Sequence, residues 1–217
     1  ASCLVGSEMC IRDRSDKIHR FYTENNSQYR IIYTDSSFKE ETSMDKFPIL
    51  KRHLDRFADI ITSDNRPYGL HRARKKHFFI GEKVVSLRKC LKPTFSYSNF
   101  DCYVGAKYYI IQTNKVNLKF LTGLLNSNLI EFWLKHKGKL QGNIYQIDKA
   151  PLLTLPIKTD DKISPIIAEK VQCIINAKKD NLDSDISSLE YEINNLVYSL
   201  YSVSDEEKQI IEDDINT

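Results

Sequence analysis

Residues 81–112 read GEKVVSLRKCLKPTFSYSNFDCYVGAKYYIIQ, and this stretch decides the fold class. It contains short runs rich in β-branched and aromatic residues, which favour strands. Gly81, Pro93, Asn99 and Gly105 stand in the gaps, and such residues favour tight turns. The alternation predicts an antiparallel or mixed sheet. Its expected strands are residues 83–88, 94–97, 101–104 and 107–112.

Helices are predicted on both sides of this stretch. Apolar residues recur at helical spacing over residues 47–61, and Asp64–Pro67 ends that helix because the residue before a proline disfavours the α conformation. Two more helical faces cover residues 118–125 and 129–133, and Asn126–Asn128 between them can cap the second helix. Further short strands are expected at residues 29–34, 144–147 and 152–157.

The last part of the chain is predicted to be helical. Apolar residues form one stripe over residues 163–175, and residues 186–200 repeat them at alternating spacings of three and four. Ser204–Glu207 is a capping box that starts another helix. The pattern predicts an α+β fold: a mixed or antiparallel sheet with flanking helices over residues 15–158, followed by a C-terminal helical hairpin in residues 159–217.

The first fourteen residues, ASCLVGSEMCIRDR, resemble a translated sequencing-adapter read-through. Arg12 and Arg14 follow the apolar residues instead of preceding them, which is the wrong order for a signal peptide. We therefore expect residues 1–14 not to be native and the natural protein to continue upstream.

Apolar runs and cysteines predict the compartment. No run approaches the length of about eighteen apolar residues that a membrane span needs, so no membrane partner is expected. The five cysteines are odd in number and show no C-x-x-C spacing, which argues against a disulfide framework or a zinc site. The sequence favours a reducing, prokaryotic cytoplasm.

The formal charge of +3 conceals an uneven distribution. Residues 16–158 hold 25 lysines and arginines against 13 aspartates and glutamates, a balance of +12. Residues 159–217 hold 5 against 14, a balance of −9. A basic body with an acidic appendage is typical of polyanion-binding proteins, although the same imbalance also arises by chance in small domains.

Two cationic segments are candidates for contact with nucleic acid. The first interleaves cations with aromatic residues, which suits phosphate neutralisation, guanine recognition and base stacking. The second lies at a predicted helix C-terminus, where cations also complement the helix dipole, so a structural role is equally open. For Phe78 and Phe79 the core is favoured. The predicted contacts are Arg66, Tyr68, His71, Arg72, Arg74, Lys75, Lys76, Arg88 and Lys89 in the first segment, and Lys137, Lys139 and Gln141 in the second.

Motifs of catalysis are missing from the sequence. No H-E-x-x-H, G-x-S-x-G or phosphate-binding G-x-x-x-x-G-K-[ST] string occurs, and the five histidines are scattered without ligand spacing. The sequence predicts no catalytic residue and no metal ligand in this chain.

The order of several strings resembles one protein family. The strings are Asp16–Tyr22, Arg66–Arg74, Glu82–Arg88, Leu121–Trp133, Gly142–Tyr145, Leu155–Ile157 and Leu189–Tyr201. In this order and spacing they resemble the TaqI-like C-terminal specificity domain of type IIG restriction–modification enzymes and related adenine-specific DNA methyltransferases. The resemblance runs over about residues 16–213.

The resemblance implies a DNA target-recognition domain that holds double-stranded DNA against an upstream catalytic domain of the same protein. That domain would use S-adenosylmethionine, and Mg²⁺ as well if it includes a nuclease, whereas this fragment would hold no cofactor. The Asn/Asp-Pro-Pro-aromatic loop of adenine methyltransferases has no full match, because Arg66 replaces the first proline in Asn65–Tyr68. The family does not fix which side chains recognise bases.

Two alternative functions stay open. The Leu124–Ile130 string is also similar in style to the DNA-specificity subunits of type I restriction–modification systems. A second copy of the unit upstream would favour such a subunit, whereas an Asn-Pro-Pro-Tyr loop there would favour the methyltransferase. The third hypothesis is a protein-interaction scaffold that binds through its helical tail.

Overall fold

The computed structural model describes residues 17–26, 31–61, 64–70, 73–105 and 107–216, and it divides the chain into two compact units. We call the first, from Asn25–Ile80 and Cys102–Ala106, the insert unit. The second, from Ser15–Glu24, Gly81–Asp101 and Lys107–Thr217, is the sheet–helix unit.

A four-stranded sheet forms the centre of the sheet–helix unit, with strand order β1-β4-β2-β5. β2 is antiparallel to β4 and β5, whereas the two-residue β1 is parallel to β4. The register places Val84 opposite both Tyr97 and Ile111. The strands are β1 (Phe21–Tyr22), β2 (Lys83–Leu87), β4 (Phe95–Ser98) and β5 (Tyr108–Ile111).

A second, three-stranded sheet, here called the small sheet, follows directly from β2. It consists of β3 (Lys89–Cys90), β7 (Ile144–Gln146) and β6 (Lys139–Gln141), in this order and antiparallel throughout. Arg88 is the junction between the two sheets. Its N–H donates to Lys107 O next to β5 (3.1 Å), and its carbonyl accepts from Ile147 N next to β7 (2.8 Å).

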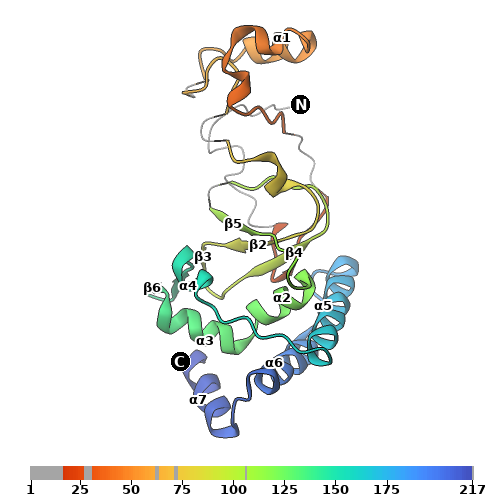
Figure 1. The fold of residues 1–217 in the computed structure, drawn as a ribbon, viewed down its shortest axis with the longest axis vertical. Helices are drawn as coiled ribbons and strands as arrows, with labels where there is room; N and C mark the ends of the chain where they lie inside the picture. The colour runs from red at the N-terminus through yellow and green to blue at the C-terminus, as the bar shows by residue number, and fades with distance from the viewer. Residues whose placement is uncertain (1–16, 27–30, 62–63, 71–72, 106, 217) are drawn as a thin grey trace. The chain divides into compact units, whose positions relative to one another are not determined.

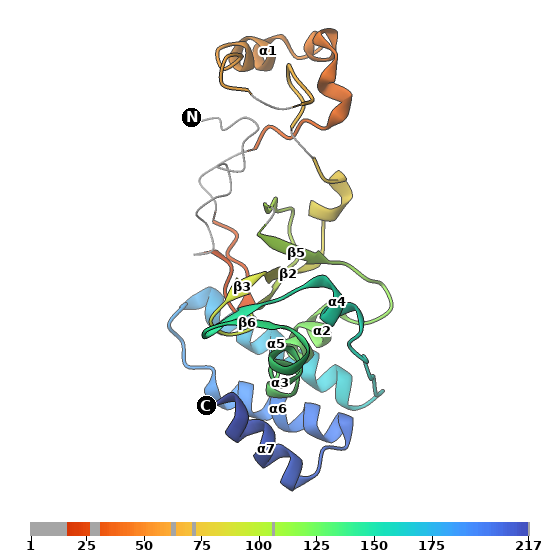
Figure 2. The same cartoon turned by 90° about the vertical axis from the view of Figure 1, so that its left-hand side faces the viewer.

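Helices cover one side of the four-stranded sheet and continue to the C-terminus, as Figures 1 and 2 show. α2 packs on β4 and against α5, and α5 packs against α6. The helices of the sheet–helix unit are α2 (Leu118–Leu125), α3 (Asn128–Lys137), α4 (Lys149–Leu153), α5 (Ile163–Asp180), α6 (Ser187–Tyr201) and α7 (Asp205–Ile215).

One apolar core joins the sheet to these helices. Phe95 of β4, Leu124 of α2, Ile167 of α5 and Val197 of α6 are all fully buried in it. Burial of such side chains is the main stabilising contribution to folding. The C-terminal helices therefore share the core of the sheet, and the predicted domain boundary at residue 158 of this chain stays a prediction.

Side-chain caps explain where the helices begin. The Asn117 carboxamide oxygen accepts from the N–H groups of Lys119 and Phe120, which starts α2. Ser127 caps α3, as the Asn126–Asn128 string predicts. Ser204 and Glu207 form the predicted capping box at α7. Each cap satisfies N–H groups that the first turn of a helix leaves unpaired.

The insert unit consists of short helices around a small core. Met44, Leu54 and Tyr68 are buried together, with Ile32 and Phe38 packed against them. The helices are η3 (Ser36–Lys39), η4 (Glu41–Met44), α1 (Pro48–Asp55) and η5 (Lys76–Phe79).

Several predicted elements differ from the structure. The helix expected over residues 47–61 ends at Asp55. Of the strand expected at 29–34, the described part, Ile31–Thr34, is not a strand. Thr34 bonds within the insert unit instead: its carbonyl accepts from Leu70 N (3.0 Å), and its hydroxyl donates to Tyr68 O (2.5 Å).

Two further strands predicted from the sequence, both within the described residues, are absent from the structure. Residues 101–104 do not pair with a strand; Tyr103 stacks on Phe79 with ring centroids 4.7 Å apart, and Cys102 N donates to Phe79 O. Residues 152–157 begin inside α4 and continue without strand pairing. Pro156 has no N–H to donate to a ladder, which disfavours a strand there.

The predicted α+β class is confirmed, with mixed pairing in the main sheet and helices at the C-terminus. The predictions for β2, β4, β5 and β7 are correct within one or two residues, whereas β1, β3 and β6 were not predicted. In the described part of the chain no helix combines the length and apolarity that crossing a membrane requires.

Gly123 of α2 packs directly against side chains of α5, and its replacement tests this packing. A Cβ atom there would lie 2.6 Å from Ile167 Cγ2 and 2.9 Å from Val171 Cγ2. Helix propensity alone would make Gly123→Ala stabilising by about 1 kcal/mol. We expect the opposite, a loss of about 1–3 kcal/mol of unfolding free energy, because a well-packed core resists extra atoms.

Chemical denaturation followed by circular dichroism measures this change. Cys173→Ala, at an exposed position of α5, is the control and should leave the midpoint unchanged. A Gly123→Ala variant as stable as the control would contradict the close packing of α2 on α5.

Candidate nucleic-acid interface

The small sheet presents one face to the core and the other to solvent. Cross-strand neighbours share a face and successive residues alternate. Cys90 and Tyr145 are paired, and both pack in or against the apolar core. Lys89 and Lys139 both pair with Gln146, so these three side chains lie on the opposite face, here called the outer face.

The outer face carries cationic and amide groups in a row. Gln141, two residues after Lys139 in β6, shares this face and accepts a hydrogen bond from Lys89 Nζ (3.3 Å). Lys139 Nζ lies 3.7 Å from Asp148 Oδ2, to which Gln146 Nε2 also donates (3.3 Å). Such exposed contacts contribute little free energy, so these groups can exchange them for a ligand.

Two more predicted residues border the small sheet. The Arg88 guanidinium lies over the Tyr109 ring, 5.0 Å from its centroid. Lys137 is exposed at the end of α3, with Nζ 5.9 Å from the Trp133 ring centroid. The helix C-terminus explains the cation at Lys137 as well as a ligand would. Together with the outer face they make a basic edge.

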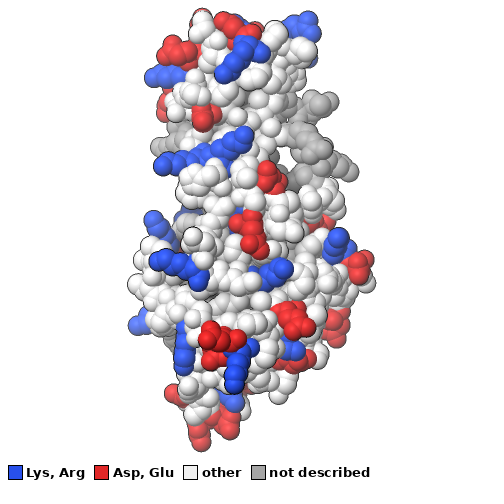
Figure 3. Space-filling view, turned by 45° about the vertical axis from the view of Figure 1, so that its right-hand side comes forward, with Lys and Arg blue, Asp and Glu red and all other residues white. Residues whose placement is uncertain are grey.

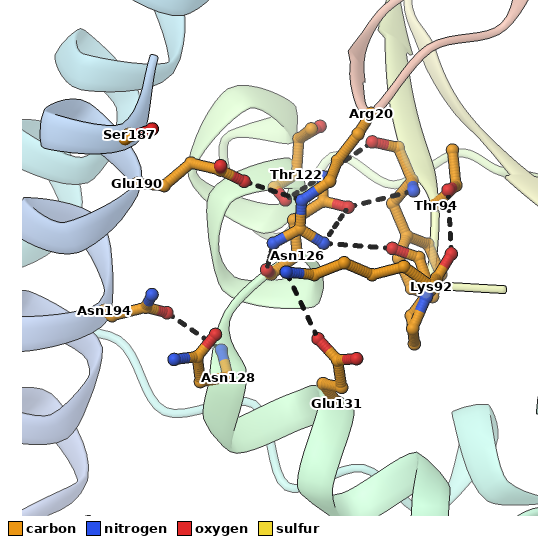
Figure 4. Close-up of polar contacts among 12 residues, drawn as sticks. Arg20, Lys92, Thr94, Thr122, Asn126, Asn128, Glu131, Ser187, Glu190 and Asn194 are labelled. Carbon is orange, nitrogen blue, oxygen red and sulfur yellow. Dashed lines mark hydrogen bonds and ion pairs between the residues drawn. The ribbon is translucent and has the colours of Figure 1, made fainter. Parts of the chain in front are cut away.

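A polar cluster fixes the sheet beside this edge, as Figure 4 shows. The Asn126 side chain, 1% exposed, accepts from Phe95 N (3.0 Å) and donates to Phe95 O (2.7 Å). Arg20 donates to Pro93 O (3.0 Å) and to the Asn126 carbonyl, and pairs with Glu190 of α6 (2.7 Å). This cluster therefore joins β4, α2 and α6 behind the β3–β4 turn.

A buried carboxylate extends the cluster to the small sheet. Glu131 of α3 accepts from the Tyr145 hydroxyl (3.3 Å), and its other oxygen lies 3.8 Å from Lys92 Nζ. Burial, together with the charge of Glu131, raises the pKa of Tyr145 to about 12. Tyr145 therefore stays protonated at neutral pH and can donate this hydrogen bond.

The insert unit holds the other described candidates. Arg66, Lys75 and Lys76 are exposed. Arg74 is half-buried, its guanidinium donates to Gly105 O (3.2 Å), and its carbonyl accepts from the Tyr33 hydroxyl. His71 and Arg72 lie outside the described residues.

Tyr68 does not fit a surface role, because the insert unit packs around it. Its ring is 5% exposed, and its hydroxyl donates to Asp55 Oδ1 (2.7 Å). Burial and this bond raise the pKa of Tyr68 to about 12. Phe79 is buried as expected, whereas Phe78 is 39% exposed. Tyr68 is therefore a core residue of the insert unit and not a surface contact.

Groups that could do covalent chemistry are few at this edge. Burial raises the pKa of the Cys90 thiol to about 11, so it is not a thiolate nucleophile at neutral pH. Among the residues that the structure describes, no group of three or more His, Cys, Asp or Glu side chains is placed to hold a metal ion. The exposed lysine and glutamine side chains of the outer face suit the binding of a polar or anionic ligand.

Sequence reasoning missed one residue of this edge and two of the polar cluster beside it. Gln146 looks like an ordinary strand residue, and only its pairing with Lys89 and Lys139 places it on the outer face. Lys92 and Arg20 belong to the polar cluster, whose contacts span up to 170 positions along the chain. Pairing residues 139–141 with residues 144–146 as a hairpin would have found Gln146, because this register places it opposite Lys139.

The family match includes residues of both units and ends before α5. Residues 14–157 match the family described as the TaqI-like C-terminal specificity domain. The chain belongs to this family. The resemblance inferred from the order of sequence strings is thus confirmed over residues 14–157, and the structure is that of such a specificity domain.

Curated relatives of this specificity domain are methyltransferases. The type II methyltransferase M.HincII of Haemophilus influenzae is 24% identical over 134 residues, which are 56% of this chain and 26% of the relative. M.HindII of Haemophilus influenzae strain ATCC 51907 is also 24% identical over 134 residues, 25% of its length. The chain therefore matches about a quarter of the length of these relatives.

A solved structure shares the fold. The type IIL restriction–modification enzyme MmeI, determined in complex with DNA, aligns with a TM-score of 0.54 and 12% identity, over 76% of this chain and 25% of that chain. At this identity the likeness shows the fold alone.

The role of Tyr68 in folding can be tested by Tyr68→Phe. This change removes the hydroxyl that bonds to Asp55 at the end of α1, and we expect a loss of about 1 kcal/mol in the local stability of the insert unit. Amide hydrogen exchange of α1 measures that loss. Tyr191→Phe, at an exposed position of α6, is the matched control. Unchanged protection in α1 would show that the hydroxyl does not support the insert unit.

Proposed function

We propose that this chain recognises a specific sequence of double-stranded DNA, as the target-recognition part of an adenine-N6 DNA methyltransferase or a restriction–modification enzyme. The observation that carries the proposal is the outer face of the small sheet. There Lys89, Lys139, Gln141 and Gln146 are brought together on one exposed surface of a specificity domain.

The chemistry of this face suits a DNA groove. A β-ribbon can enter the major groove, where lysine pairs with guanine and glutamine pairs with adenine. Lysines also neutralise phosphates and release counterions, which contributes affinity without sequence preference. The outer face has both kinds of group on a rigid sheet, so it can combine affinity with base recognition.

The charge of the rest of the sheet–helix unit fits one-sided binding. α7 begins with Asp205, Glu206 and Glu207 and ends with Asp213 and Asp214. Acidic side chains gather at the α7 end in Figure 3. The acidic side chains of α7 repel a polyanion. This repulsion favours the small sheet as the DNA-binding side of the unit.

The relatives indicate what kind of enzyme the parent protein would be. Both curated relatives are type II methyltransferases, which favours a methyltransferase over a type I specificity subunit. The parent would carry a catalytic domain upstream that binds S-adenosylmethionine and acts on an adenine turned out of the duplex, with Mg²⁺ as well if it includes a nuclease. Its bacterial relatives fit the expected prokaryotic cytoplasm.

Binding to a randomised duplex pool tests the proposal. Repeated selection with this chain should enrich one short sequence that contains adenine, and affinity for it should fall steeply between about 50 and 200 mM salt because phosphate contacts release counterions. Fluorescence anisotropy measures both. Binding without enrichment, or binding independent of salt, would refute sequence-specific recognition.

Single substitutions separate the contributing surfaces. Lys89→Ala and Lys139→Ala should each weaken binding and lower the slope of log K against log salt by about one, as expected for one lost phosphate contact. Arg66→Ala, Lys75→Ala and Lys76→Ala test the insert unit in the same way. Lys179→Ala, at an exposed position of α5, is the control and should change neither quantity. Equal effects in all variants would mean that net charge alone sets the affinity.

A further inference from the structure

The turn between β3 and β4 holds an exposed leucine between two lysines. Leu91 is 76% exposed, and Lys89 and Lys92 stand two residues before it and one after it. A single exposed apolar side chain is ordinary on a protein surface. What separates Leu91 from such cases is the number of contacts that fix the turn around it.

Each residue next to Leu91 has a backbone contact. Cys90 pairs with Tyr145 in the small sheet. The Lys92 carbonyl accepts from the Thr94 hydroxyl (2.9 Å), and the Thr94 carbonyl accepts from Leu87 N (3.2 Å). The turn is thus held on both sides by hydrogen bonds within the sheets.

The buried cluster behind the turn holds its far end. Arg20 donates to Pro93 O, and Asn126 bonds both backbone groups of Phe95, the first residue of β4. Figure 4 shows these contacts converging where the turn enters β4. The backbone of such a turn is preorganised, so little backbone entropy is lost when a side chain on it binds.

The flanking charges indicate what the leucine contacts. Lys89 and Lys92 attract a polyanion, and the adjoining outer face holds Lys139 and Gln141. On the base edges of the major groove the apolar group is the C5 methyl of thymine. An apolar side chain between cations at the edge of a DNA-binding sheet therefore has one matching partner there.

We propose that Leu91 contacts the C5 methyl group of a thymine in the major groove of the recognised sequence. This inference rests on the function proposed above and names a specificity-determining residue of that site. The lysines on either side bind phosphates, and the Arg20–Asn126 cluster positions the turn.

Replacement of thymine by deoxyuridine tests the contact, because it removes only the methyl group. Each thymine of the selected duplex, on either strand, is replaced in turn, and affinities of the whole chain are measured by anisotropy. At one position we expect the native chain to bind about fourfold more weakly, the fold-change for one methyl group returned to water. In Leu91→Ala the same replacement should have almost no effect, so the two changes are coupled in a double-mutant cycle.

Two variants act as controls. Leu91→Met keeps a side chain of similar volume and should retain the loss caused by deoxyuridine. Ile210→Ala removes an exposed apolar side chain of α7 and should leave every affinity unchanged. Because Leu91 is exposed, Leu91→Ala should melt at the temperature of the native chain, which circular dichroism checks.

The outcomes separate this inference from the proposed function. Specific binding with the same deoxyuridine effect in the native chain and Leu91→Ala overturns the thymine contact alone. A Leu91→Ala variant that binds all duplexes more weakly by one factor also overturns it, since it indicates a wedge or a general contact. A chain that selects no sequence refutes the proposed function, and the inference with it.

Discussion

The carboxamide of Asn126 is the group on which the arrangement of the sheet–helix unit depends. It stands at the end of α2, immediately before the cap of α3, and bonds both backbone groups of Phe95. The backbone carbonyl of Asn126 accepts from Arg20, which pairs with Glu190 on α6. Because the amide is buried, loss of any partner leaves a polar group without water or protein to bond, and this penalty favours one register of helix and sheet.

Local patterns in the sequence account for those elements that are stabilised locally. β2, β4, α2 and α3 follow from composition, periodicity and caps, which act over a few residues. The strand expected at 101–104 failed because Tyr103 stacks on Phe79, a contact that no local pattern encodes. β-Propensity describes a surface that suits a sheet, but the partner strand is chosen by the tertiary fold.

The candidate site shows the same limit. The cationic segments predicted Lys89, Lys139 and Gln141 as DNA contacts, which stays a prediction, and the structure adds that the three are exposed and share one face. Tyr68 was grouped with its cationic neighbours, although it is the centre of a small core, because sequence spacing alone does not distinguish a buried ring from a stacking one. The role of Arg20 was not predicted, because its partners lie 73 to 170 residues away in the sequence.

The two faces of the small sheet have different consequences for how such a protein can change. Cys90 and Tyr145 on one face are packed in or against the core, so replacing them carries a folding penalty. Lys89, Lys139 and Gln141 on the other face support no packing, and surface substitutions of this kind alter stability by only about 0.5 kcal/mol. Under the proposed function, specificity can therefore change by single substitutions while the scaffold stays intact, which would make the outer face an evolvable template for new DNA targets.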